Sequence, residues 1–411
     1  MRGVQSLASV GSLGLNVLRQ DLPFPVCIAK ESAIQGNRLW MRGFLASAGV
    51  LIAPHAKTTM SPQLLAMQLQ DGVWGFTVAT AQQLCVLRSF GMRRILIANQ
   101  LIGRANVQYV YQELDCDPSL EVYALVDSPD SLAHILKWAP PKGAGCLALL
   151  VEVGADGGRT GCRSPESAIA LAQKIASSGS RVRLGGIEAY ESVFPSLDAG
   201  ERLQRIEHLL DQVIQVADHV GSAGWFKDSR PLLSAGGSEY FDRVAARLRT
   251  WADAGRATVL LRSGCYITQD NLAYARAYQT LKSRSPQMCP PGLNLTAALE
   301  VWAVVQSRPE PGLALLTAGK RDVSYDFEMP VPVRWFRPGT HVEAQPVHDG
   351  CRIRRLNDQH AFLEFPTECE FEVGDLVGLG ISHPCTTFDK WSLIFMVDDN
   401  YEVRDGLTTY F

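Results

Sequence analysis

The sequence predicts an α/β fold: a (β/α)8 TIM-type barrel followed by a C-terminal β-rich domain. Two observations lead to this prediction. Short apolar runs alternate with helix-like segments up to about residue 275, and such alternation indicates parallel strands joined by helices. Beyond that point the helical periodicity weakens, and Val, Phe and Thr runs alternate with Gly and Pro. A chain of 411 residues, 46% of them hydrophobic, is long enough for both domains.

Eight apolar runs have the length of strands, and the segments between several of them have helical spacing. Eight strand–helix units in about 220 residues fit a closed barrel, with a doubly wound open sheet as the alternative. The predicted strands are Val50–Ala53, Phe76–Ala79, Ile95–Ala98, Val122–Val126, Leu147–Val153, Leu184–Ala189, Leu232–Ala235 and Val259–Leu261.

Helix ends can be recognised between some of these strands. Ser164 fits an N-cap, Pro165 a first-turn residue and Gly179 a helix stop. Another helix is expected after Asp198, where Leu, Ile and Val recur at helical spacing.

We predict three parts along the chain. Residues 1–25 form an N-terminal segment that pairs with the β-rich domain, residues 26–280 form the barrel, and residues 281–411 form the β-rich domain. The Pro- and Ser-rich segment Ser283–Leu293 is expected to be a linker. Strand-like runs in the last part include Leu299–Val305, Ala361–Phe365, Leu376–Ile381 and Leu393–Val397.

The composition excludes several classes of protein. The 39 basic and 42 acidic residues are well mixed, which gives no reason to expect a nucleic-acid partner. No run approaches the roughly 18 apolar residues of a membrane span. Ten scattered cysteines without a CxxC pair argue against a disulfide scaffold or a zinc ribbon. Ser and Gly interrupt the apolar stretch at the start of the chain, which argues against a signal peptide. We therefore expect a cytoplasmic protein.

Catalytic groups of barrels follow the C-terminal ends of the strands, so candidate site residues are expected there. The first predicted strand is followed by His55, Lys57 and two threonines. A lysine at such a place, walled by apolar neighbours, can act as a Schiff-base lysine. The alternative is a solvated loop lysine.

Two loops rich in small residues follow the seventh and eighth strands. Their backbone N–H groups can approach a phosphate, which barrels commonly bind at these two loops. A lysine at one end and a phosphate site at the other fit pyridoxal 5′-phosphate. The residues are Gly236, Gly237 and Ser238 in the first loop, and Arg262, Ser263, Gly264 and Tyr266 in the second.

Two further strand ends supply polar groups. Arg159 follows the fifth strand and could bind a carboxylate or flank the cofactor ring, or form a loop salt bridge. Tyr190 follows the sixth strand and could contact the ring, or pack at the rim.

The β-rich domain carries a His-Pro-Cys motif. His383 and Cys385 lie two residues apart, which on an extended segment directs both side chains to one side. Imidazole and thiolate suit zinc, and two protein ligands leave open positions, as in a catalytic site. The alternative is a chance pair in which Cys385 is simply buried.

These motifs together resemble a known family. The sequence is similar to the fold-type III pyridoxal-phosphate enzymes with an alanine-racemase-like barrel, in the branch of D-serine dehydratases and D-threonine aldolases. The resemblance rests on Pro54–Met60, Asp71–Gly75, Ala79–Ala81, Gly319–Ser324 and His383–Trp391, and extends over almost the whole chain.

The resemblance implies Lys57 as the Schiff-base lysine and His383 with Cys385 as ligands of a divalent metal. Dehydratases of this group resemble the chain in having Cys at the second ligand position, where the aldolases tend to have Asp. Cys385 therefore favours a dehydratase with zinc, Mn²⁺ and Mg²⁺ being the other candidate metals.

The implied reaction is β-elimination from a D-β-hydroxy amino acid, giving a 2-oxo acid and ammonia. Retro-aldol cleavage of the same substrates to an aldehyde and glycine or another amino acid is the alternative. Racemisation and a non-catalytic cofactor carrier rank lower, because neither needs the metal motif. In the family the active site lies between the barrel of one subunit and the second domain of another, which implies a homodimer with shared sites.

Overall fold

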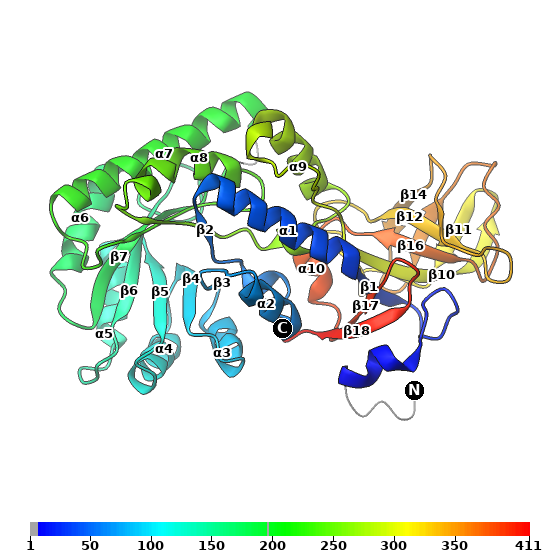
Figure 1. The fold of residues 1–411 in the computed structure, drawn as a ribbon, viewed down its shortest axis with the longest axis horizontal. Coiled ribbons are helices and arrows are strands. Elements are labelled where there is room, and N and C mark those ends of the chain that lie inside the picture. Colours follow the sequence, from blue (N-terminus) through cyan, green and yellow to red (C-terminus); the bar gives the residue numbers. More distant parts are fainter. Residues whose placement is uncertain (1–6, 195–196) are drawn as a thin grey trace.

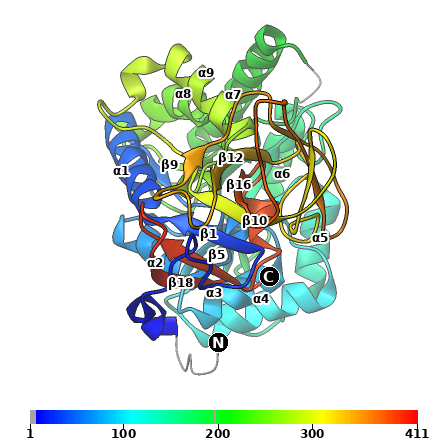
Figure 2. The same ribbon diagram turned by 90° about the vertical axis from the view of Figure 1, so that its right-hand side faces the viewer.

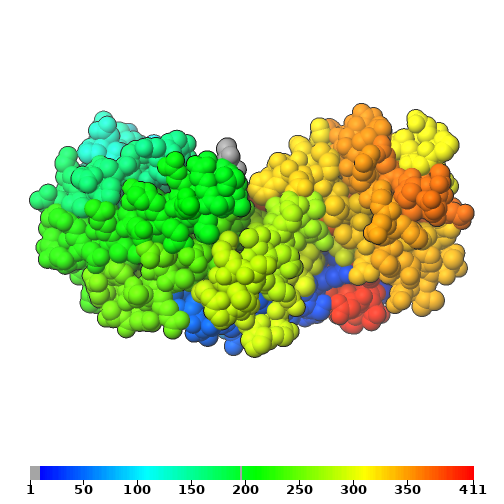
Figure 3. Space-filling view, turned by 90° about the horizontal axis from the view of Figure 1, so that it is seen from above, coloured from blue at the N-terminus to red at the C-terminus, as the bar shows by residue number. Residues whose placement is uncertain are grey.

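The computed structural model describes residues 7–194 and 197–411, and the first six residues of the predicted N-terminal segment lie outside that range. The chain forms two lobes, a barrel with its helices and a second sheet (Figure 1). The surface is hollowed between the two lobes (Figure 3).

All eight predicted barrel strands are present, and they pair in parallel in the order β2-β9-β8-β7-β6-β5-β4-β3. A parallel bridge between His55 and Thr77 joins the end of β2 to β3. The predicted fold class is thus confirmed. The strands are β2 (Leu51–Ile52), β3 (Phe76–Val78), β4 (Arg94–Gln100), β5 (Glu121–Val126), β6 (Leu147–Val153), β7 (Val182–Ala189), β8 (Leu232–Ser234) and β9 (Thr258–Leu261).

Helices surround the barrel and follow the expected caps. Ser164 caps α6 by accepting the N–H of Ser167, with Pro165 at the first position, and Asp198 caps α7. The helix α6 ends at Ala176, three residues before Gly179. The helices of this lobe are α1 (Glu31–Ala48), α2 (Pro62–Gln70), α3 (Ala81–Ser89), α4 (Arg104–Cys116), α5 (Pro129–Trp138), α6 (Pro165–Ala176), α7 (Ala199–Ser222), α8 (Phe241–Asp253) and α9 (Ala273–Arg284).

The second sheet follows the linker, where a short 3-10 turn, η4 (Pro286–Met288), is the only regular element between α9 and β10. Its main path runs β13-β12-β16-β10-β1-β17-β18, with β11, β15 and β14 branching from β10. The strands after the linker are β10 (Leu299–Glu310), β11 (Leu313–Leu316), β12 (Val331–Phe336), β13 (Gln345–Pro346), β14 (Arg352–Leu356), β15 (Ala361–Glu364), β16 (Leu376–Gly380), β17 (Leu393–Val397) and β18 (Val403–Thr408).

The first strand belongs to the second sheet, although the sequence placed it in the barrel. The predicted barrel begins at residue 26, but β1 (Val26–Lys30) pairs antiparallel with β10 and parallel with β17 in the second sheet (Figure 2). The chain enters the barrel lobe only with α1. The preceding segment also meets this sheet, through a bridge between Asn16 and Glu402.

The end of the chain returns to the barrel. After β18 the Tyr410 N–H donates to the Met60 carbonyl at 3.0 Å, and Thr408 bonds Gln63 on α2. These hydrogen bonds attach the C-terminal end of the chain to the segment that follows Lys57.

Candidate active site

The predicted cofactor residues gather at one end of the barrel, because parallel strands bring their C-terminal ends to the same side. The residues come from the loops after β2, β6, β7, β8 and β9. Lys57 lies on the 3-10 turn η2 (Ala56–Thr58), where its side chain is exposed and makes no hydrogen bond or ion pair with the described residues.

His55 lies beside the lysine, in surroundings that disfavour its charged form. Burial, and then the positive charges of Lys57 and Arg262, hold the pKa of His55 well below its usual value. Its Nδ1 is buried and has no hydrogen-bond partner among the described residues. His55 is therefore neutral and has a nitrogen available to a bound group.

The loop after β8 needs its glycines. A Cβ on Gly237 would lie 2.9 Å from the Tyr190 ring, and Gly236 has φ +104°. The N–H groups of these two glycines donate to the buried Glu191 carboxylate, at 2.9 and 2.7 Å. The amides that the sequence assigned to a phosphate thus bind Glu191, whereas Ser238, half-buried at the end of the loop, hydrogen-bonds the Cys265 thiol.

The loop after β9 packs tightly against the lysine turn. A Cβ on Gly264 would lie 2.6 Å from both the His55 carbonyl oxygen and Thr58 Oγ1. Ser263 donates its hydroxyl to the Gly237 carbonyl at 2.5 Å. The two small-residue loops therefore form one rigid wall next to Lys57.

A buried ion pair lies beneath this wall. Arg262 Nη2 is 2.5 Å from Glu188 Oε1, with exposed fractions of 5% and 1%. Burial raises the pKa of the Glu188 carboxyl to about 8, although Arg262 opposes the shift. Glu188 Oε2 has no partner among the described residues, so this carboxyl can still take up or give a hydrogen bond.

The other three candidates differ in their surroundings. Arg159 is exposed, and its guanidinium lies 4.4 Å from the centroid of the Tyr190 ring, an arrangement that fixes both at the rim. The Tyr266 phenol is buried and accepts a bond from Gln68 at 3.1 Å. Tyr266 is thus packed behind the loop wall, beside a small void that Ser238 and Ser263 also line.

The His-Pro-Cys motif stands at the start of α10 (Cys385–Phe388), between the two lobes (Figure 1). Asp326 Oδ2 is 2.6 Å from His383 Nδ1, and its other oxygen accepts the Thr386 hydroxyl at 2.7 Å. A carboxylate on Nδ1 orients the ring and leaves Nε2 for a metal. Burial disfavours the charged ring, but Cys385 and Asp326 together raise the pKa of His383.

Cys385 is disposed to be a thiolate. Its Sγ is 3.7 Å from Cys265 Sγ, and hydrogen bonds with Cys265 and then His383 outweigh burial and hold the pKa of Cys385 well below its usual value. Thiolate and neutral imidazole are the forms that bind zinc.

The metal motif and the lysine turn meet within one chain. Cys385 Sγ lies 3.5 Å from Thr58 Oγ1, next to Lys57. The fold therefore brings the metal motif beside the lysine turn along a single chain, whereas the expected sharing of sites between subunits stays a prediction.

The donor set fits a metal with open positions. Among residues 7–194 and 197–411, no group of three His, Cys, Asp or Glu side chains is arranged to hold a metal ion. His383 and Cys385 would thus be a two-residue set supported by Asp326, and other ligands would complete the shell. A pyridoxal cofactor also fits, since the turn that carries the exposed Lys57 lies against the Gly264 loop and includes His55, whose Nδ1 has no partner among the described residues.

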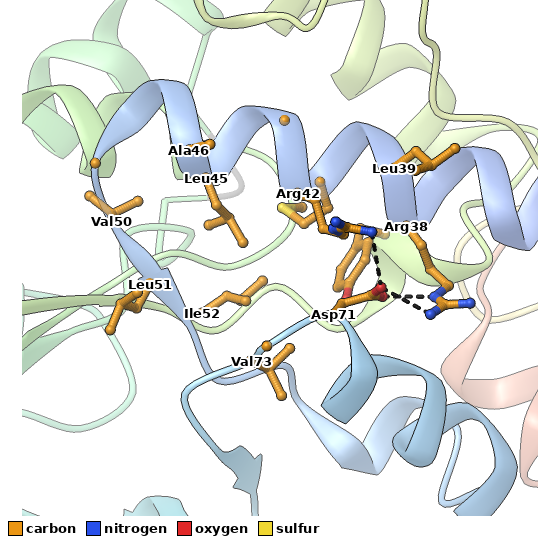
Figure 4. Close-up of a pocket in the computed structure, with 15 residues that line it drawn as sticks. Arg38, Leu39, Arg42, Leu45, Ala46, Val50, Leu51, Ile52, Asp71 and Val73 are labelled. Atoms are coloured by element: carbon orange, nitrogen blue, oxygen red, sulfur yellow. Dashed lines mark hydrogen bonds and ion pairs between the residues drawn. The ribbon is translucent and has the colours of Figure 1, made fainter.

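A separate cavity of about 620 Å³ lies on the outside of the barrel, between α1 and β2 (Figure 4). Leu45, Ile52 and Val73 line it, and Asp71 is paired there with Arg38 at 2.7 Å. It contains none of the predicted site residues except Tyr266.

Sequence reasoning missed Asp326 and Glu191 and gave Thr58 and Cys265 no specific role. Asp326 follows the Gly319–Ser324 motif, and Glu191 follows Tyr190, so each lies next to a residue or motif that the sequence singles out. Nothing in the spacing indicates that these side chains turn toward His383 and the Gly236 loop.

Comparisons with known proteins show what the chain is similar to. Residues 298–397 match the family described as "Putative serine dehydratase domain". The chain is 24% identical over 377 residues to a D-threo-3-hydroxyaspartate dehydratase from Delftia sp. (strain HT23), covering 89% of this chain and 92% of the relative. The chain thus resembles D-serine dehydratases and D-threonine aldolases, in sequence over residues 298–397 and in fold over almost its whole length.

Several solved structures share the fold. D-threonine aldolase from Filomicrobium marinum superimposes with a TM-score of 0.79 at 21% identity, over 96% of this chain and 97% of that one. The Delftia dehydratase gives 0.72 at 20% identity, over 96% and 99%. An alanine racemase from Bacillus anthracis gives 0.62 at 13% identity, over 94% and 99%.

Within the described part of the chain, none of the helices has the length and apolar character of a membrane span.

Proposed function

We propose that the protein is a lyase that uses pyridoxal 5′-phosphate and a divalent metal, most simply Zn²⁺, to dehydrate a D-β-hydroxy amino acid. The products are a 2-oxo acid and ammonia. The observation that carries the proposal is the 3.5 Å contact between Cys385 Sγ and Thr58 Oγ1, which unites the lysine turn with the metal motif. A dehydratase among the relatives supports this reaction.

Lys57 would hold the cofactor, and His383 and Cys385 would hold the metal. When bound, the cofactor supplies an electron sink for the substrate Cα and the metal a Lewis acid for the β-oxygen. The ε-amine of Lys57 takes up the Cα proton. Lys57 precedes Thr58 in the chain and Cys385 contacts it, so a substrate bound there would present Cα to the amine and its β-oxygen to a metal held by His383 and Cys385.

The remaining cofactor residues would provide binding and orientation. We assign the phosphate to the loops Gly236–Ser238 and Arg262–Gly264, where Ser238 and the amides after Ser263 are donors not committed to Glu191. His55 would contact the cofactor through its free Nδ1. Arg159 and Tyr190, stacked at the rim, would bind the substrate carboxylate or the ring edge.

The assay follows both carbon skeletons. The purified protein is incubated with D-threo-3-hydroxyaspartate, D-serine and D-threonine, and 2-oxo acid, ammonia, aldehyde and glycine are measured. Oxo acid with ammonia is expected, and aldehyde with glycine would mean retro-aldol cleavage instead. A chelator should abolish turnover, and added Zn²⁺ should restore it. Absence of all four products with every substrate would refute the proposal.

Compartment and assembly belong to the same proposal. Ten cysteines without a disulfide among the described residues suit a reducing cytoplasm. A homodimer is proposed from the family resemblance, and size-exclusion chromatography with light scattering tests it.

A further inference from the structure

Two cysteines from different lobes meet in the candidate active site. Cys265 begins η3 (Cys265–Ile267) after barrel strand β9, and Cys385 begins α10 in the second lobe. Their sulfurs are 3.7 Å apart although 120 residues separate them in the chain. Both are free, Cys265 buried and Cys385 half-buried.

The surroundings leave the two sulfurs in direct contact. Thr58 Oγ1 lies 3.9 Å from Cys265 Sγ and 3.5 Å from Cys385 Sγ, and Tyr274 and Ser238 also hydrogen-bond the Cys265 thiol. A disulfide has an S–S length of about 2.0 Å, so the sulfurs need to approach by about 1.7 Å. Rotation of the cysteine side chains, whose sulfurs are already adjacent, can supply much of that movement.

We propose that Cys265 and Cys385 form a reversible disulfide when the site holds no metal and a two-electron oxidant such as hydrogen peroxide reaches it. The sulfur of Cys385, the more exposed of the two, attacks a peroxide oxygen, which gives a sulfenic acid and one water. The sulfur of Cys265 then attacks the sulfenic sulfur, the S–S bond forms, and the hydroxyl leaves with the thiol proton as a second water. The pair loses two electrons and the peroxide gains them.

The disulfide would remove one of the two proposed ligands from the metal site. A disulfide sulfur has no thiolate to offer, so Cys385 ceases to be a ligand. The same bond joins η3 to α10 across the cleft. A bound metal would in turn hold Cys385 and protect it. This last part rests on the proposed function, whereas formation of the bond does not.

The protein contains a matched pair for comparison. Cys351 and Cys369 are also 3.7 Å apart, in the second lobe away from Lys57. Cys85 and Cys116 are exposed and report whether the oxidant acts.

The experiment treats the full-length chain, with and without Zn²⁺, with hydrogen peroxide and maps the cysteines by mass spectrometry. A Cys265–Cys385 peptide, 2 Da lighter than the two thiol peptides, is expected without zinc and not with it. Loss of the Cys351 and Cys369 thiols should be the same in both samples. Zinc affinity should fall at least about tenfold after oxidation and return with dithiothreitol.

The variant Cys265→Ser tests the second step. It should form no link, and dimedone should trap a sulfenic acid on Cys385. The proposal is overturned if both thiols stay free while Cys85 and Cys116 are oxidised, or if the link forms equally with zinc bound. Failure of the unoxidised protein to bind zinc would count against the proposed function alone, because the peptide map still tests the bond.

Discussion

The contact between Asp326 and His383 makes a quantitative prediction. Asp326→Asn keeps the size of the side chain but removes its charge, and its single acceptor oxygen can serve either His383 or Thr386. A hydrogen bond to a charged group is worth about 1.5–3 kcal/mol. Since the Asp326 side chain is 39% exposed, water will replace part of the loss, which places the effect near the lower bound. We therefore expect zinc affinity to fall about 10- to 30-fold.

The affinity is measured by competition with a chromophoric chelator on the metal-free protein, so the readout does not depend on turnover. Asp326 also raises the pKa of His383, and its loss would ease competition by protons. The titration is therefore repeated at increasing pH above the usual histidine value of about 6.5, and the two proteins are compared where the zinc affinity no longer changes with pH. Asp358→Asn, which alters an exposed carboxylate 3.4 Å from Arg321, is the control. Equal zinc affinity in the two variants would refute the role given to Asp326.

Three further predictions concern the lysine turn. Lys57→Ala should purify without the near-visible absorption of a covalently held cofactor, and persistence of the band would mean that another residue holds it. Gly264→Ala places a Cβ 2.6 Å from Thr58 Oγ1 and should lower the free energy of unfolding, measured in urea, by about 1–3 kcal/mol. The control Gly36→Ala adds a Cβ with nothing within 4 Å and should not lower it. Equal urea midpoints for the two variants would contradict the prediction. Burial lowers the pKa of His55, so below about pH 6.5 this residue is protonated in the unfolded chain but not in the folded one. The free energy of unfolding therefore falls as the pH falls, by up to about 1.4 kcal/mol per pH unit. His55→Gln should remove that part of the slope between about pH 5 and 6.5, as urea unfolding at several pH values would reveal; an unchanged slope would mean that His55 is charged in the folded state.

The barrel could be predicted because strands of a buried parallel sheet have short, continuous apolar sequences. All eight runs became strands, from Leu51–Ile52 to Thr258–Leu261. The segment Val26–Lys30 is an apolar run of the same kind, and nothing in it tells which sheet it will join. Its partners, β10 and β17, lie about 270 and 365 residues further along the chain, and only tertiary pairing reveals them.

The candidate site was predictable to a similar depth. Lys57, His383 and Cys385 stand in motifs, so residue type and spacing were enough to single them out. Asp326 and Glu191 act through the direction of a side chain that crosses to another loop. Such contacts leave no local pattern, which is why they required the structure.

The position of β1 between β10 and β17 limits how this protein can be divided. A fragment of residues 281–411 would lack the strand that joins β10 to β17, and both would present unpaired backbone N–H and C=O groups along an exposed edge. Such edges invite pairing with other chains, so we expect that fragment to aggregate unless residues 26–30 are supplied. The second lobe is therefore not a transferable module, and its sheet can be completed only after the chain has returned from the whole barrel.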